Sequence, residues 1–131
     1  MIYSDSLFEN CKTEQQFKML WLKEKKKKLP LNVYPFCIET EETVKGFPDV
    51  MILDCNRNQN VSVFYEFKIS DSNGKIKFQP TQPAFYRKYN KMLICVVALD
   101  KKNNKVHLFS TKELFDKNSP YFMNEKAEVK L

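Results

Sequence analysis

The sequence has 131 residues, of which 43% are hydrophobic and 29% are charged, so it is long enough to bury one core and favours a single domain over residues 1–131. Its formal net charge of +6 and its pI near 9.1 favour a polyanion over a basic or neutral partner. Nearly all of the basic side chains are lysines, which attract phosphate but read base edges poorly, and only Arg57 and Arg87 offer a forked side chain.

Cysteine and histidine usage argues against a zinc site or a disulfide framework. The cysteines stand far apart in the sequence, so we expect reduced core residues in an intracellular protein; they are Cys11, Cys37, Cys55 and Cys95. A single histidine, His107, gives little basis for a Cys/His zinc site or a Ser-His-Asp triad, and we expect a strand histidine. No basic-then-apolar leader opens the sequence and no apolar run approaches the roughly 20 residues of a membrane span, so we expect no membrane partner.

The first strong element along the chain is an amphipathic helix over about residues 13–28. Thr13 can cap this helix, with Gln16 three residues later as in a capping box. Apolar residues then follow at the spacing of one helical face: Phe17, Leu20 and Trp21. Residues 1–12 indicate no more than a short helical turn.

Both ends of this helix have a structural and a functional interpretation. Glu14 lies in the first turn, where an acid is stabilised by the helix dipole, and a role in a site is the alternative. The helix closes with four consecutive cations, Lys25, Lys26, Lys27 and Lys28. A solvated helix end accounts for them, and contact with nucleic-acid phosphates is the alternative.

Three strands are predicted next. The run from Val33 to Glu39 contains Pro35, which favours an edge strand. Apolar runs from Val50 to Asp54 and from Val61 to Ile69 flank a polar turn at residues 56–60, and this pattern predicts an antiparallel hairpin. A loop at residues 41–45 and the turn at Gly46 precede the hairpin.

The hairpin brings the candidate chemistry together. Glu66 and Lys68 lie two apart on one strand and therefore share a face, while Phe67 points to the other. Folding about the turn brings Asp49 level with this pair. Whether Glu66 or Lys68 lies opposite Asp49 is left open by a one-residue register, and Asp49 approaches them only if it lies on their face.

The second half of the chain predicts a helix, two strands and a short final helix. After a loop at residues 70–75, a helix begins at Pro80 or Thr81. Helical spacing places four residues on one face, and the basic residues lie on the other flank. The face comprises Gln82, Phe85, Tyr86 and Tyr89, and the flank comprises Arg87, Lys88 and Lys91. Strands are predicted at residues 92–99 and 105–110, with a hairpin turn between them, and a capping box at residues 110–113 begins a helix to about residue 115. The predicted fold class is α/β, with a central mixed sheet flanked by helices in the order α-β-β-β-α-β-β-α.

Two converging carboxylates indicate metal-assisted phosphate chemistry. Asp49 and Glu66 could bind Mg²⁺ or Mn²⁺ through oxygens, with help from the Phe67 backbone carbonyl. A metal held in this way polarises a phosphodiester and activates water, and Lys68 could orient that water or stabilise the developing charge. The structural alternative for Lys68 is a lysine that extends along the rim of a strand to solvent.

These residues resemble the signature of the PD-(D/E)xK nuclease superfamily. Gly46-Phe-Pro-Asp49 followed by Glu66-Phe-Lys68 is most similar to the small VRR-NUC and Holliday-junction-resolvase-like members, over about residues 13–98. The resemblance implies a restriction-endonuclease-like fold, metal ligands at Asp49, Glu66 and the Phe67 carbonyl, and a catalytic Lys68. It also implies supporting roles for Glu14 and for a glutamine, with Gln82 the better match and Gln79 the lesser. Pro80 and Pro83 flank Gln82, so a helix-opening role is its alternative.

The expected function is therefore that of a Mg²⁺- or Mn²⁺-dependent endonuclease that acts on DNA by structure rather than sequence. The expected DNA contacts are Lys25 to Lys28, Arg87, Lys88 and Lys91. A homodimer is a further expectation, because branched DNA suits symmetric pairs. Two alternatives stay open: a nucleic-acid-binding protein on the same fold that does not cleave, and an interaction or inhibitor protein whose basic patch faces an acidic partner.

Overall fold

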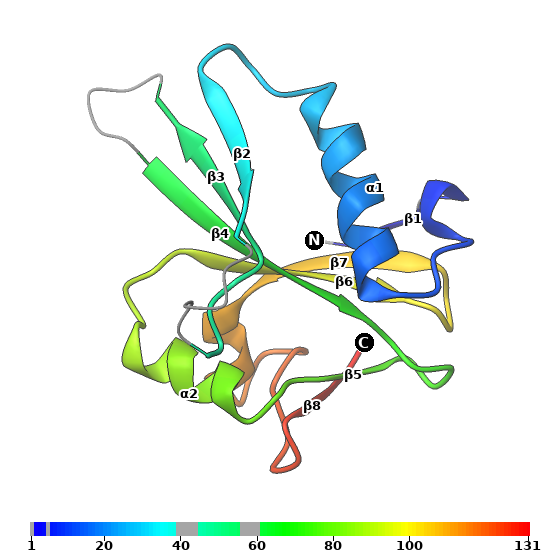
Figure 1. Cartoon of the computed structure of the whole chain (residues 1–131). Coiled ribbons are helices and arrows are strands. Elements are labelled where there is room, and N and C mark those ends of the chain that lie inside the picture. The colour runs from blue at the N-terminus through cyan, green and yellow to red at the C-terminus, as the bar shows by residue number, and fades with distance from the viewer. Residues whose placement is uncertain (1, 5, 39–44, 56–60) are drawn as a thin grey trace.

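The computed structural model describes residues 2–4, 6–38, 45–55 and 61–131, and its main feature is a six-stranded mixed sheet with helices on both faces (Figure 1). The elements in chain order are β1 (Ile2–Ser4), η1 (Ser6–Phe8), α1 (Glu14–Lys26), β2 (Val33–Cys37), β3 (Val50–Asp54), β4 (Val61–Ile69), β5 (Lys75–Lys77), α2 (Thr81–Lys88), β6 (Ile94–Asp100), β7 (Lys105–Ser110), η2 (Thr111–Phe115) and β8 (Glu128–Lys130). The η segments are short 3-10 helices.

The large sheet has the strand order β1-β7-β6-β4-β3-β2. Strands β4 and β6 are parallel and are joined through α2, whereas the other neighbouring strands are antiparallel. The mixed sheet and the β3–β4 hairpin are confirmed. Strand β2 lies at the edge of the sheet, as Pro35 predicts, because proline has no N–H for a second neighbour.

The sheet separates two cores. On β6, Val97 and Leu99 pack toward α1, while Val96 and Ala98 pack toward α2 and the C-terminal segment. This alternation follows from the two-residue period of a strand buried on both faces. A fold with one helical layer on each face of the sheet is the result.

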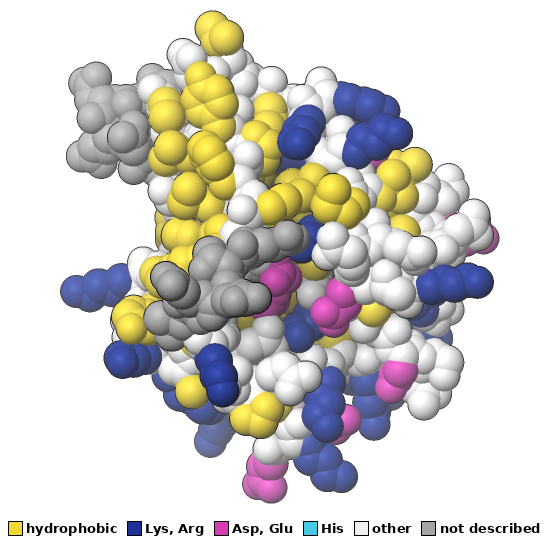
Figure 2. Space-filling view, viewed as in Figure 1, with side chains coloured by type: hydrophobic (Ala, Val, Ile, Leu, Met, Phe, Trp, Pro, Cys, Tyr) yellow, Lys and Arg dark blue, Asp and Glu magenta, His cyan; other side chains and the backbone are white. Residues whose placement is uncertain are grey.

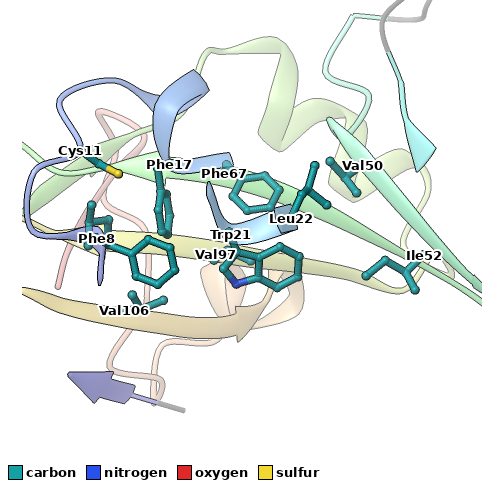
Figure 3. Packing of buried hydrophobic residues seen from close by; sticks show 11 residues of the cluster. Phe8, Cys11, Phe17, Trp21, Leu22, Val50, Ile52, Phe67, Val97 and Val106 are labelled. Carbon is teal, nitrogen blue, oxygen red and sulfur yellow. The ribbon is translucent and has the colours of Figure 1, made fainter. Parts of the chain in front are cut away.

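Aromatic side chains build the core beneath α1. Phe17 and Trp21 from α1 meet the fully buried Phe67 of β4 edge to face, with ring centroids 5.8 and 5.2 Å apart (Figure 3). Phe8 from η1 adds a further edge contact to Phe17 at 5.2 Å. Edge-to-face pairs of this kind add to the stability that comes from buried area, so α1 is fixed firmly against β4.

Both predicted capping boxes are present. The Thr13 hydroxyl accepts from the Gln16 N–H at 3.1 Å, and the Gln16 side chain accepts from the Thr13 N–H at 3.3 Å. The same reciprocal arrangement joins Ser110 and Glu113. The second box begins a 3-10 helix, η2, and not the predicted α-helix.

Several other expectations are corrected. The three-residue strands β1, β5 and β8 were not predicted; β5 begins at Lys75, where a loop was expected, and pairs with β8. Strand β2 ends at Cys37, and the loop expected at residues 41–45 and the turn at residues 56–60 lie mostly or wholly outside the described residues. The cysteines are free, but Cys37 and Cys55 are exposed, because β2 is an edge strand and Cys55 follows the end of β3. His107 is a buried strand histidine, as expected.

Within the described residues, no helix combines the length and the apolar character needed to cross a lipid bilayer.

Candidate active site

The register of the β3–β4 hairpin places Asp49 on the face of Glu66 and Lys68. Val50 pairs with Tyr65 across the two strands, so Asp49, one residue earlier, comes opposite Glu66. Directly opposed residues of antiparallel strands share a face. The register that the sequence left open is therefore the one that opposes the two acids.

Asp49 and Glu66 are in direct contact. The two carboxyl groups share a hydrogen bond, and the Phe67 N–H donates to Asp49 Oδ2 at 3.5 Å. Glu66 is only 2% exposed. Burial, followed by the hydrogen bond and the negative charge of Asp49, raises the pKa of Glu66 far above its ordinary range. The pair therefore holds a proton where two bare carboxylates would repel each other.

Lys68 projects from β4 beside these acids and is also buried. Its Nζ donates to Gln82 Oε1 at 2.9 Å and lies 5.0 Å above the centre of the Phe78 ring. The Lys68 charge favours the ionised forms of Glu66 and Glu14. Lys68 is thus a fixed internal cation, which contradicts the alternative of a lysine extended to solvent.

Gln82 links the acid to the lysine. Its Nε2 donates to Glu66 Oε1, while its Oε1 accepts from Lys68 Nζ and from the Gln79 backbone N–H, both at 2.9 Å. Of the two candidate glutamines, only Gln82 brings its side chain to the site; Gln79 contributes a backbone donor. Gln82 also lies in the first turn of α2, so both interpretations of this residue apply.

A glycine turn positions α2 against the hairpin. Gly46 has φ +90°, and a Cβ placed on it would collide with the Thr81 carbonyl oxygen and would lie 2.9 Å from Phe85 Cβ. Only glycine allows this close approach between the turn before Asp49 and the start of α2. The turn and the helix together bring Asp49 and Gln82 to Glu66.

Replacing Gly46 with alanine should therefore lower the melting temperature strongly and displace Gln82 from the site. Gly74 provides a matched control, because it also has positive φ, +80°, but its nearest neighbour for a Cβ is the Asp100 side chain at 3.3 Å. Strain at a positive φ costs about 1 kcal/mol in both variants, and only Gly46→Ala adds a backbone collision. Thermal unfolding that shows equal losses for Gly46→Ala and Gly74→Ala would contradict this account.

Glu14 reaches the same site from the start of α1. Partial burial raises the pKa of its carboxyl, which lies close enough to Lys68 and Asp49 to feel both charges and accepts from the Ile69 backbone N–H. The helix-dipole interpretation applies as well, because Glu14 is the first residue of α1. Sequence position alone did not distinguish the two, and the structure brings Glu14 to the carboxylate pair.

Tyr86 is a site residue that the sequence reasoning assigned only to the apolar face of a helix. Its ring is 3% exposed, and its hydroxyl has no hydrogen-bond partner among the described residues. Burial, with the negative charges of Glu66 and Asp49, raises the pKa of this hydroxyl. The available signal was its spacing, since Tyr86 follows Gln82 by one helical turn and so lies on the same side of α2.

Replacing Tyr86 with phenylalanine should leave the free energy of unfolding unchanged or slightly higher, because a buried hydroxyl without a partner costs about 1–3 kcal/mol of lost hydration. Urea unfolding monitored by circular dichroism measures this directly. Phe85→Leu is a volume control at a neighbouring buried position. A loss of stability in Tyr86→Phe larger than that in Phe85→Leu would show that the hydroxyl makes a stabilising bond.

The expected DNA-contacting cations lie away from the carboxylates. Helix α1 begins at the site and extends 13 residues, about 20 Å at 1.5 Å per residue, before it reaches Lys26. Lys27 pairs with Glu24 at 2.9 Å. On α2, Arg87 stacks 4.6 Å from the Phe115 ring and Lys88 lies over Tyr89. Figure 2 shows most of the lysine and arginine side chains of this face toward its margin, and acidic side chains with basic side chains beside them near its middle.

The donor set suits a hard divalent cation. The described residues contain no group of three or more His, Cys, Asp or Glu side chains arranged to hold a metal ion, so the candidate ligands are the Asp49 and Glu66 carboxylates and a backbone oxygen. The Phe67 N–H faces Asp49, and the N–H and C=O of one strand residue leave the strand on the same side. The Phe67 carbonyl is therefore directed toward the acids. Two carboxylates and a carbonyl fit Mg²⁺, which keeps several waters when protein-bound.

Comparisons with known proteins give distant structural likeness and no match to a family model or a curated protein. The solved structure of a nuclease from a fusselovirus is similar with a TM-score of 0.47 and 9% sequence identity, covering 76% of this chain and 63% of the other. This chain thus spans less than two thirds of that nuclease. A likeness at this level carries no argument about function, which must come from the site.

Proposed function

We propose that this chain is a divalent-metal-dependent nuclease that hydrolyses phosphodiester bonds in DNA. The observation that carries the proposal is the convergence of Asp49, Glu66 and Lys68 on one face of the β3–β4 hairpin, with Gln82 hydrogen-bonded to both Glu66 and Lys68. A carboxylate pair beside a buried lysine is a costly arrangement for stability alone. Perturbed carboxyl pKa values at such a cluster are typical of functional sites.

Each residue has a defined task in this proposal. Asp49, Glu66 and the Phe67 carbonyl would hold Mg²⁺ or Mn²⁺, which when bound supplies Lewis-acid stabilisation of the phosphate and a lower pKa for water. Lys68 Nζ, fixed by Gln82, would donate to the attacking water or to a phosphate oxygen and stabilise charge that develops there. Glu14, which accepts from the Ile69 N–H near Lys68 and Asp49, would accept a hydrogen bond from a water at the site.

The proposal extends to the fold family. A restriction-endonuclease-like architecture of the PD-(D/E)xK kind is supported by three features of the chain: a helix that carries Glu14 before the hairpin, a hairpin that carries the acids and the lysine, and a helix that carries Gln82 after it. The lysine-rich charge supports selection of DNA by shape over base sequence.

A panel of labelled DNA substrates tests the proposal. Linear duplex, flapped, splayed, four-way and single-stranded DNA are incubated with the purified chain in EDTA, Mg²⁺ or Mn²⁺. We expect cleavage in Mg²⁺ or Mn²⁺ and none in EDTA. Binding without cleavage under every metal condition would reject the nuclease and favour a binding protein built on the same site.

A further inference from the structure

An apolar strip extends from the candidate active site to the free edge of the sheet. Phe36 pairs with Met51 and Met51 with Phe64, while Tyr34 pairs with Leu53. These residues share the sheet face of Asp49 and Glu66, because opposed residues lie on one face and residues two apart on a strand do too. Figure 2 shows hydrophobic side chains gathered over the β2–β3 region on the same face as the central acidic side chains.

The outer end of this strip exposes two aromatic rings. Tyr34 is 48% exposed and Phe36 is 45% exposed. They lie two residues apart on β2, about 7 Å along the strand. The Tyr34 hydroxyl donates to Asn32 Oδ1 at 3.4 Å, which limits the orientation of the ring. Contiguous apolar surface that is left exposed often marks a binding site.

A hollow beside Tyr34 adds a positive charge. This hollow, of about 540 Å³, lies between the end of α1 and β2 and is lined by residues that include Lys26 and Tyr34. The neighbouring Lys25, Lys27 and Lys28 carry more charge at the same helix end. Aromatic side chains on an edge strand with lysines at the same end of it suit a nucleotide strand, whose bases can stack while its phosphates meet the cations.

We propose that the strip formed by Tyr34 and Phe36, with the Lys26 hollow beside it, binds a single-stranded segment of the DNA substrate and leads it to Asp49 and Glu66. The inference takes its ligand from the proposed function and specifies the substrate class as DNA with an unpaired segment next to the cleaved bond. Rings on an open sheet face stack bases of any sequence, which agrees with a lysine-rich protein that has little means of reading base edges.

Charge argues for this occupant over a second copy of the chain. A second copy of the chain carries the same formal net charge of +6 and the same lysines beside the strip. Like charges placed close together at an interface oppose association. A nucleic-acid strand supplies the opposite charge to the same lysines.

The test measures binding without cleavage. Fluorescence anisotropy in EDTA follows a labelled oligo-dT strand of about 16 nucleotides and a duplex of the same length, with the full chain and with the double variant Tyr34→Leu/Phe36→Leu. Leucine retains apolar surface but removes the rings. Phe122→Leu is the matched control, because Phe122 is 43% exposed and lies outside the strip. Thermal melting verifies that each variant is folded.

We expect the double variant to bind the single strand at least about ten-fold more weakly, since stacking contributes about five-fold or more per base and two rings are removed. Duplex binding should change less than about two-fold by the same reasoning, and Phe122→Leu should bind both as the parent does. Unchanged single-strand binding in the double variant, equal losses for both DNAs, or a parent chain that does not bind the single strand would each overturn the inference.

Sedimentation velocity tests whether a second copy of the chain, and not a DNA strand, occupies the strip. A parent dimer that becomes a monomer in the double variant would assign the strip to a second copy and overturn the inference. Failure of the nuclease proposal gives a different result: the parent binds the single strand through the two rings in EDTA yet cleaves no substrate in Mg²⁺ or Mn²⁺.

Discussion

Replacing Lys68 with alanine should slow metal-dependent cleavage by about 10²–10³-fold while the fold remains intact. Among the described residues, Lys68 is the cation that lies beside the Asp49–Glu66 pair and donates to Gln82. Loss of one preorganised donor to developing charge reduces the rate by about 10²–10³-fold. Initial rates on the most rapidly cleaved substrate of the panel, in Mg²⁺, measure the effect.

Two controls show whether the loss of activity comes from Lys68 itself: the variant must stay folded, and a second lysine variant must keep its activity. The Gln82 oxygen that loses Lys68 still accepts from the Gln79 N–H, so no buried acceptor is left without a partner. Lys75→Ala, at an exposed position on β5, is the control for a simple loss of positive charge. If folded Lys68→Ala cleaves as fast as Lys75→Ala, the proposed role of Lys68 is wrong.

Replacing Glu66 with glutamine should change activity and stability in opposite directions. The variant removes one of two carboxyl groups that compete for a proton in a buried site, yet its side-chain oxygen still accepts from Gln82 Nε2. We expect a higher melting temperature at neutral pH without metal, together with loss of cleavage because a metal ligand is gone. For a domain of this size each kcal/mol shifts the melting temperature by about 4 °C.

The pH dependence has a definite sign. Folding raises the pKa of Glu66, so the folded state binds a proton that the unfolded chain has already released above about pH 4.3. This contribution to stability is therefore greatest at acid pH and declines as the pH rises toward the raised pKa. Parent stability measured in EDTA should fall more steeply from pH 5 to pH 8 than that of Glu66→Gln.

Bound metal should restore the stability that the unsubstituted protein loses when Glu66 ionises, and should have no such effect on Glu66→Gln. A cation bound between Asp49 and Glu66 replaces the shared proton, so Mg²⁺ should raise the melting temperature of the parent and have little effect on Glu66→Gln. Differential scanning calorimetry with and without Mg²⁺ measures both. A parent that gains no stability from Mg²⁺ or Mn²⁺ would contradict metal binding at this pair.

Local sequence patterns predicted part of the candidate site. The two-residue period of β4 put Glu66 and Lys68 on one face, and the capping pattern at Thr13 fixed the helix start that carries Glu14. The register between β3 and β4 was not predicted. It depends on how β3 and β4 pair, and no local pattern distinguishes a slip of one residue.

What the sequence did not predict depends on tertiary contact. Strands β1, β5 and β8 have three residues each, too few for a periodic pattern, and they exist because a neighbouring strand satisfies their backbone groups. Tyr86 was assigned to an apolar face, since its closeness to Glu66 arises only when α2 packs on the sheet. Exposure of Cys37 likewise depends on the place of β2 at the edge.

Alternate residues of β4 serve different purposes: one set of side chains is needed for folding and the other for the candidate active site. Phe67 contributes its ring to the core beneath α1 and its backbone N–H to Asp49, while the residues on either side of it contribute side chains to the site. A library of random substitutions in this strand should therefore separate by parity. Most variants at Tyr65 and Phe67 would be lost through misfolding, and only other large apolar side chains would be tolerated there, whereas variants at Glu66 and Lys68 would accumulate as folded, inactive protein.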